Sequence, residues 1–145
     1  MVVGERNDPY AVFNFIIEID GIASAGFSEC SGLTTDTDVI DYREGNEGLT
    51  VRKLPGLRKY SNIILKRGMT KDLSLWEWRK AVIAGKVERK AGSVVLLDEV
   101  GTEIHRWNFR EAWPSKWDGS ALDAKKNESF IETLELVHEG VEIDS

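Results

Sequence analysis

Every second residue is apolar along the first hydrophobic segment of the chain, residues 13–19, and this period of two limits the fold more than any other feature of the sequence. Successive side chains of a strand point to opposite faces of a sheet, so the pattern predicts a strand with one buried face. The segment ends at Asp20 and Gly21, residue types that tolerate the positive φ of a tight turn. The chain is therefore expected to reverse there into a second strand.

Six further segments are rich in β-branched or aromatic residues and are separated mostly by short connections. Seven such segments predict a mainly β fold, an antiparallel barrel or sandwich. The length of 145 residues fits a single domain, residues 1–145, with enough buried surface for a real core. The six segments are residues 22–33, 37–43, 60–67, 87–97, 102–113 and 128–138.

One segment breaks the β pattern. Residues 70–84 favour a helix, and Gly85 is placed to end it. At 100° per residue its apolar side chains fall on two arcs, although a helix that covers only its own sheet needs one stripe. The second arc is therefore either buried by a neighbouring subunit or part of one wide stripe in which Arg79 snorkels. The first arc holds Leu75, Trp78 and Val82, and the second holds Leu73, Trp76, Ile83 and Ala84.

Two stretches show no periodicity and are predicted to be irregular. Residues 44–57 contain three glycines and a proline and are longer than a hairpin connection requires. Residues 114–126 carry Trp117 among small and polar residues. Long loops of compact domains are usually functional or mobile, so the first stretch is a candidate functional segment.

The residues that carry chemistry form no active-site pattern. Cys30 is the single cysteine, so the chain has no internal disulfide, and it has no metal-ligand spacing to His105 or His138. All three residues fit structural positions in strands better than a catalytic pair. The glycines form no phosphate-binding loop, and carboxylate pairs such as Glu132 and Glu135 arise by chance in a chain with 25 acidic residues. The sequence therefore predicts no enzyme activity, catalytic residue, cofactor or metal.

Charge and hydropathy argue against several classes of protein. The 25 acidic residues outnumber the 19 basic ones, and the net charge of −6 opposes a broad surface for nucleic acid. The chain has no run of 18 apolar residues and its first residues lack an apolar core, so neither a membrane helix nor a secretory signal is expected. A single cysteine agrees with synthesis in a reducing cytoplasm.

Five tryptophans are the one compositional excess that points to a ligand, because exposed indole rings stack on sugars. Trp107, Trp113 and Trp117 would form such a platform in a carbohydrate-binding β-sandwich, which is the alternative function. Trp76 and Trp78 belong to the predicted helix, and Trp107 alternates with polar neighbours as a core residue does. Places in the core or a subunit interface explain most of these rings better.

Several stretches resemble, in order and over nearly the whole chain, one known family. The segments LPGL…LKRG and NFREAWPSKW are the most specific. Together the stretches resemble the tail tube proteins of contractile-tailed phages and the inner tube proteins of extracellular contractile injection systems. They are FSECSGL (27–33), YREG (42–45), KLPGLRKYSNIILKRGMT (53–70), LWEW (75–78), RWNFREAWPSKW (106–117) and ETLELVHEGVEI (132–143).

The resemblance implies a β-barrel of two packed antiparallel sheets with one flanking helix, a fold shared with the haemolysin-coregulated proteins of type VI secretion. It also implies hexameric rings that stack into a hollow tube, with sheath, baseplate or initiator, and terminator proteins as partners. Sheath contraction would drive the tube through a membrane, and luminal cargo, DNA or a protein effector, would pass without specific binding. The chain would be made in the cytoplasm and assembled into a phage tail or an extracellular particle.

Two kinds of subunit contact follow from the residue patterns once the chain is taken as a tube subunit. The second helix arc, represented by Leu73, Trp76 and Ile83, is expected in the ring interface. The long glycine-rich stretch is expected to reach the adjacent ring, where Arg52 and Lys53 would meet acidic partners. Its contact residues would be Gly45, Gly48, Arg52, Lys53, Leu54 and Pro55.

The negative charge predicts the character of the lumen. Acidic walls repel DNA phosphates and acidic cargo, whereas a basic lumen would retain a polyanion. Glu18, Glu29 and Glu135 are the acids expected to line the channel, because they occupy strand positions between apolar neighbours. Basic residues are expected mostly at subunit contacts or on the outer wall.

Overall fold

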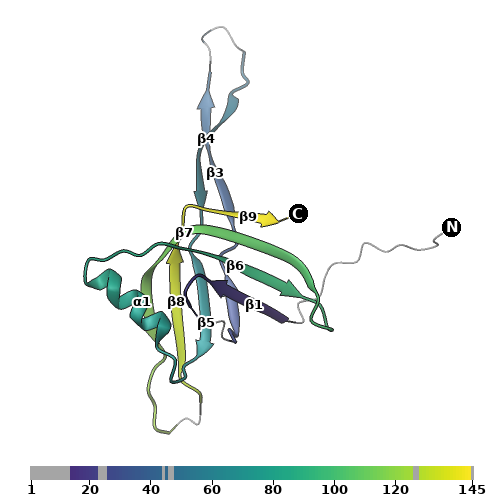
Figure 1. Cartoon of the computed structure of the whole chain (residues 1–145). Coiled ribbons are helices and arrows are strands. Elements are labelled where there is room, and N and C mark those ends of the chain that lie inside the picture. The colour runs from purple at the N-terminus through teal and green to yellow at the C-terminus, as the bar shows by residue number, and fades with distance from the viewer. Residues whose placement is uncertain (1–13, 23–25, 44, 46–47, 126–127, 145) are drawn as a thin grey trace, which may run out of the picture.

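The computed structural model describes residues 14–22, 26–43, 45, 48–125 and 128–144, and this part of the chain forms nine strands and one helix (Figure 1). The mainly β fold with one helix is confirmed. In chain order the elements are β1 (Asn14–Ile19), β2 (Glu29–Ser31), β3 (Thr35–Tyr42), β4 (Arg52–Tyr60), β5 (Ile63–Gly68), α1 (Ser74–Ile83), β6 (Lys90–Leu97), β7 (Glu103–Gly119), β8 (Ile131–Val137) and β9 (Gly140–Asp144).

The long strand β7 joins two antiparallel half-sheets. Its first part pairs with β6 and β9, and its last part pairs with β8. The half-sheets therefore run β1-β6-β7-β9 and β7-β8-β5-β2. Glu111 has a φ of 53° between the two parts, which lets the strand turn from one half-sheet into the other. In Figure 1 the strands β1 and β6 run across the view, whereas β5 and β8 run up and down it.

The core lies between the half-sheets and follows the predicted alternation. Ile17 and Ile19 of β1 are buried while Glu18 between them is exposed, and Leu134 and Leu136 of β8 alternate with half-buried residues. The helix closes one side of the core with Leu75. The buried apolar cluster consists of Ile17, Ile19, Phe27, Ile63, Leu65, Leu75, Trp78, Val94, Phe109, Ala112, Leu134, Leu136 and Val141.

The predicted loop over residues 44–57 is wrong in its second half, because residues 52–57 belong to β4. Among the described strands β4 pairs with β3 alone, and the resulting hairpin projects from the body of the molecule (Figure 1). The register shifts between Thr37 and Val39, where Gly56 lies close against the opposite strand. A Cβ at Gly56 would come within 3.2 Å of the Asp38 carbonyl oxygen, a tight contact that would require β3 to shift slightly.

Three other boundaries differ from the sequence prediction. Residues 114–119 continue β7 and are not a loop, because they form a ladder with β8. The segment 22–33 contains only the short strand β2 among its described residues, and β9 was not predicted. The helix begins at Ser74, later than residue 70, because the Asp72 carboxylate accepts a hydrogen bond from the Ser74 N–H at 3.0 Å and forms a turn before it.

A buried ion pair ties the helix to the β8-β5 half-sheet. Arg67 and Glu132 are register partners on β5 and β8, and each is 1% exposed. Arg67 Nε lies 3.4 Å from Glu132 Oε1, and Arg67 Nη1 lies 3.5 Å from Asp72 Oδ2, just before α1. The guanidinium also lies over the Phe27 ring, 5.5 Å from its centroid. Desolvated charges of this kind are tolerated only when they are paired.

We expect Glu132→Gln to lower the free energy of unfolding by about 3 kcal/mol, because the substitution leaves the Arg67 charge buried without its main partner. The measurement is urea denaturation followed by tryptophan fluorescence. Glu135→Gln is the matched control on the same strand, since Glu135 lies on the outer face, and it should change stability by no more than about 0.5 kcal/mol. Equal losses in the two variants would contradict a stabilising role for the buried pair.

Candidate assembly surfaces

The residues that most often carry chemistry are scattered through the fold. His138 Nε2 lies 2.9 Å from the Ser61 carbonyl oxygen, and the His105 ring lies beside Trp107. Glu132 points into the core whereas Glu135 lies on the outer face of the same strand, so the two form no carboxylate pair. The described residues contain no group of three or more His, Cys, Asp or Glu side chains that is arranged to hold a metal ion.

Cys30 is half-buried against the core and faces a small apolar hollow. Burial raises the pKa of its thiol to about 11, so the reactive thiolate is scarce at neutral pH. The hollow has a volume of about 190 Å³ and is lined in part by Phe15, Leu33 and Trp107. These features fit the predicted role of Cys30 as a small packing residue. As a separate observation, the described chain has no helix long and apolar enough to span a membrane.

The three tryptophans of the alternative sugar platform do not form an exposed surface. Trp107 and Trp117 are packed against the core, and Trp113 is half-buried. Trp117 also makes an edge-on contact with Trp76 of α1, with ring centroids 5.1 Å apart. The indole rings therefore serve mainly to pack the helix and the half-sheets together.

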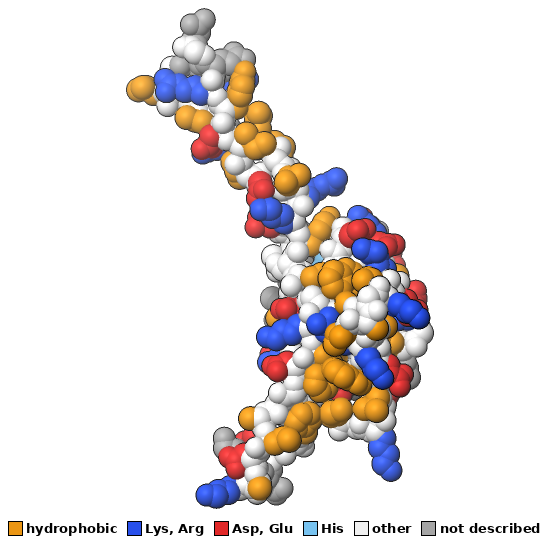
Figure 2. Space-filling view, turned by 90° about the vertical axis from the view of Figure 1, so that its left-hand side faces the viewer, with side chains coloured by type: hydrophobic (Ala, Val, Ile, Leu, Met, Phe, Trp, Pro, Cys, Tyr) orange, Lys and Arg blue, Asp and Glu red, His pale blue; other side chains and the backbone are white. Residues whose placement is uncertain are grey.

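The helix carries its two apolar arcs as predicted. Leu75 and Trp78 of the first arc are buried, and the Trp78 indole donates a hydrogen bond to the Glu88 carbonyl oxygen at 2.8 Å. Between the arcs, the Arg79 guanidinium donates to the Pro114 carbonyl oxygen at 3.3 Å. The second arc is exposed in the single chain, on the side of the molecule that Figure 2 faces. The exposed fractions are 44% for Leu73, 36% for Trp76 and 62% for Ile83.

The β3–β4 hairpin exposes many apolar residues and pairs with no other described strand. A two-stranded hairpin alone is at best marginally stable in water, so this one is expected to gain support from another surface. Two exposed ion pairs cross it, Lys53 to Asp41 at 2.7 Å and Lys59 to Asp38 at 3.0 Å. Its exposed large apolar residues, including those of the connection, are Val39, Ile40, Tyr42, Leu49, Val51, Leu54 and Leu57.

The residues predicted to contact the adjacent ring divide between the hairpin connection and a strand. Gly45 and Gly48 lie in the connection, but Arg52, Lys53, Leu54 and Pro55 lie in β4 and face Tyr42, Asp41, Ile40 and Val39 of β3. The expectation that all six belong to one loop is therefore wrong. The first part of β4 was not predicted as a strand because both of its faces are exposed in the single chain, so its residues show no alternation.

The three acids predicted to line the lumen lie on different surfaces. Glu18 is on the outer face of the β1-β6-β7-β9 half-sheet, where it pairs with Arg106 at 2.8 Å. Glu29 and Glu135 are on the outer face of the other half-sheet, where Glu29 lies 3.4 Å from Lys66. The outer faces of two packed sheets point away from each other, so one wall cannot carry all three acids.

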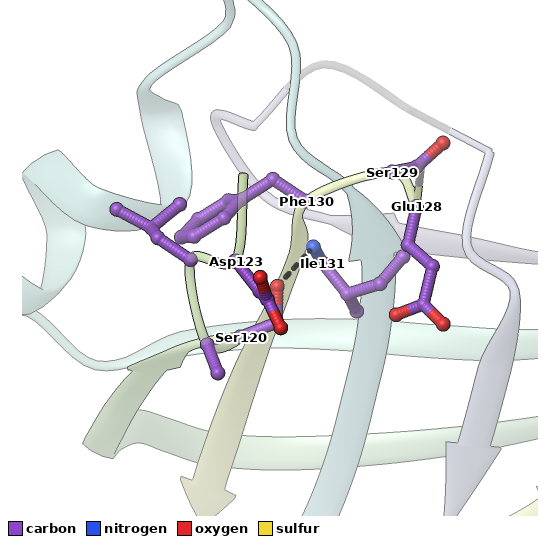
Figure 3. Close-up of a pocket in the computed structure, with 8 residues that line it drawn as sticks. Ser120, Asp123, Glu128, Ser129, Phe130 and Ile131 are labelled. Atoms are coloured by element: carbon purple, nitrogen blue, oxygen red, sulfur yellow. Dashed lines mark hydrogen bonds between the residues drawn. The ribbon is translucent and has the colours of Figure 1, made fainter. Parts of the chain in front are cut away.

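A hollow of about 280 Å³ lies at the end of the molecule opposite the hairpin, where the connection between β7 and β8 turns back (Figure 1). Figure 3 shows Phe130 on one side of Ile131 and Glu128 on the other, with Asp123 and Ser120 facing them. The Ile131 N–H donates to Ser120 Oγ at 3.0 Å, and the Ser120 N–H donates to the Ile131 carbonyl oxygen at 2.9 Å. These two bonds fix the base of the hollow.

Similar proteins share this fold over nearly its whole length. The family model described as T4-like virus tail tube protein gp19 matches residues 11–142. A chain in the sheath-tube complex of the PVC extracellular contractile injection system is 26% identical with a TM-score of 0.85, and the match covers 96% of this chain and 93% of that one. A chain in the tube terminating cap of the anti-feeding prophage is 30% identical with a TM-score of 0.86, covering 97% and 93%.

More distant structures share the fold alone. Hcp1 from Flavobacterium johnsoniae is 17% identical with a TM-score of 0.59, covering 90% of this chain and 94% of that one. A search of curated protein sequences gives no significant match.

Proposed function

The chain belongs to the family of T4-like virus tail tube proteins, and from this membership we propose that identical copies form hexameric rings that stack into a hollow tube. It is a structural subunit of the inner tube of a contractile injection system or contractile phage tail. The match to the family model over residues 11–142 is the observation that carries this conclusion. The carbohydrate-binding alternative has no support, because the three tryptophans it requires are all partly buried and form no exposed platform.

The proposed partners are the sheath around the tube, the baseplate at one end and a terminator cap at the other. Similar chains occur in a sheath-tube complex, a baseplate and a tube terminating cap. The single domain of residues 1–145 acts as a building block and not as an enzyme. It is made in the cytoplasm and assembled into the particle, and DNA or a protein effector passes through the lumen without a specific binding site.

The tube axis follows the long direction of the molecule, from the β3–β4 hairpin to the β7–β8 connection (Figure 1). Barrel strands run along the axis with a tilt of roughly 35–45°, so strands that cross the axis cannot close a wall around it. The strands β5 and β8 run in the long direction, whereas β1 and β6 run across it. The β7-β8-β5-β2 half-sheet is therefore the one that lines the lumen.

This orientation places Glu29 and Glu135 in the lumen and Glu18 on the outer wall. The luminal face also carries Lys66 and Lys116, because these residues share its strand positions. Lys66 is paired with Glu29 at 3.4 Å. Asp118 shares this face, so three acids stand against two lysines. The wall is thus of mixed charge with a small acidic excess, a surface to which neither a polyanion nor a polycation binds strongly.

The helix supplies part of the ring interface through Leu73, Trp76 and Ile83. These side chains remain exposed after the first arc has been buried by the fold. Fully apolar anchors surrounded by polar residues are typical of the centre of an interface. The end of the hairpin contacts the adjacent ring. Its contact residues are Gly45 and Gly48 of the connection and Arg52, Lys53, Leu54 and Pro55 at the start of β4.

Negative-stain electron microscopy of the purified chain tests the proposed assembly. Rings with six-fold symmetry, or tubes built from them, are the expected result. A protein that remains monomeric at high concentration, alone and together with its sheath protein, would contradict the proposed hexameric tube.

We expect Ile83→Glu to prevent ring formation while changing the free energy of unfolding by less than about 0.5 kcal/mol, because the side chain is exposed in the single chain. Light scattering after gel filtration measures the oligomer, and urea denaturation measures stability. Lys80→Glu is the matched control, since it changes charge on an exposed position of the same helix outside the apolar arcs. Trp76→Glu should prevent rings too, but it also removes the contact with Trp117. Intact rings of the Ile83→Glu variant would place the interface elsewhere.

Reversing the charge of the two proposed luminal acids tests the charge of the lumen. Assembled tubes of Glu29→Lys/Glu135→Lys should retain short single-stranded DNA several-fold more than the parent tubes, and added salt should release it. Co-sedimentation with labelled DNA is the measurement. Glu18→Lys is the control and should leave DNA retention unchanged. Retention by Glu18→Lys tubes, without retention by the double variant, would assign the lumen to the other half-sheet.

A further inference from the structure

The two most exposed large apolar side chains among the described residues lie at opposite ends of the folded molecule. Leu49 is 99% exposed in the connection between β3 and β4, and Leu122 is 87% exposed in the connection between β7 and β8. The two connections form the two extremes of the molecule in Figure 1. Burial of an exposed leucine side chain is favourable, so both residues favour a surface that covers them.

The end that carries Leu122 already contains a formed receptor. Leu122 borders the hollow, together with Phe130 and Ile131. Gly119 makes room for the Phe130 ring, because a Cβ at this position would lie 2.7 Å from Phe130 Cζ. The Met69 N–H donates to the Phe130 carbonyl oxygen at 2.9 Å, which links this end to the strand β5 side of the fold. The hollow therefore needs little rearrangement before it binds.

The size and composition of the hollow fit a protruding side chain. A volume of about 280 Å³ lies below the roughly 300–1,000 Å³ of small-molecule sites. Its lining combines apolar side chains, among them Phe130 and Ile131, with the carboxylates of Asp123 and Glu128 (Figure 3). An exposed leucine with basic neighbours suits such a pocket, and Arg52 and Lys53 follow Leu49 along the chain.

We propose that Leu49 of one subunit inserts into the hollow beside Leu122 of the next subunit along the tube. This inference rests on the proposed function, since it names the surfaces through which rings stack. A contact between unlike ends is heterologous and repeats without limit, whereas contacts between like ends would close into pairs and stop. The ion pairs Lys53–Asp41 and Lys59–Asp38 brace the hairpin that presents Leu49.

Disulfide trapping tests this contact with two single-cysteine proteins. Both carry Cys30→Ala, one has Leu49→Cys and the other has Leu122→Cys. The proteins are mixed under tube-forming conditions, oxidised and separated on a non-reducing gel. We expect a mixed disulfide dimer at least tenfold more abundant than in a control mixture in which Val100→Cys replaces one partner. Val100 is 80% exposed, but it lies in the turn between β6 and β7 and not at either end.

A chain that carries both Leu49→Cys and Leu122→Cys should give a ladder of cross-linked multimers, because each subunit then has two unlike ends. Tubes visible by electron microscopy without the mixed dimer would overturn this contact and leave the proposed function standing. A mixed dimer no more abundant than in the Val100→Cys control would overturn it as well. Complete absence of rings and tubes in the parent protein, both alone and together with its sheath protein, would contradict the proposed hexameric tube itself.

Discussion

The pairing of β7 with strands of both half-sheets is the interaction on which the rest of the structure depends. One strand of 17 residues forms ladders with β6 and β9 in its first part and with β8 in its last part. These hydrogen bonds fix the crossing of the half-sheets, and the crossing creates the core between them. It also directs β5, β8 and the hairpin along one axis and β1 and β6 across it. In the proposed tube one half-sheet lines the lumen and the other faces outward, and this arrangement requires the strands of the two half-sheets to run in different directions.

The sequence predicted the elements in which one face is buried by the chain itself. The alternation of β1 and β8 and the first arc of α1 were readable because burial within the subunit imposes a period on apolar residues. Residues 37–43 of the hairpin were predicted as a strand from their residue types, but β4 was missed, since it is exposed on both faces and Pro55 and Gly56 interrupt its pattern. A hairpin that is exposed on both faces in the single chain imposes no period on its apolar residues.

Two further features could not be predicted from the sequence. They are the buried pair of Arg67 and Glu132, and the placement of the three predicted luminal acids on two different faces. A charged residue in an alternating strand looks like a surface residue, and only the register between β5 and β8 shows that these two meet inside. For the same reason the sequence did not show that Glu18 lies on a different face from Glu29 and Glu135. Alternation indicates that each acid lies on an outer face, but the packing of the half-sheets decides which outer face that is.

A tube subunit must stay soluble alone and yet associate strongly with its copies. The exposed apolar residues of this chain are therefore distributed over separate places, the second arc of α1, the hairpin and the β7–β8 connection. Charged residues lie beside the apolar ones in both β3 and β4, and lysines on exposed strands oppose uncontrolled edge-to-edge pairing. Each contact by itself is weak, whereas a subunit within a stack of rings makes several at once. Association then depends on simultaneous engagement, so that growth from an existing ring is favoured over random aggregation.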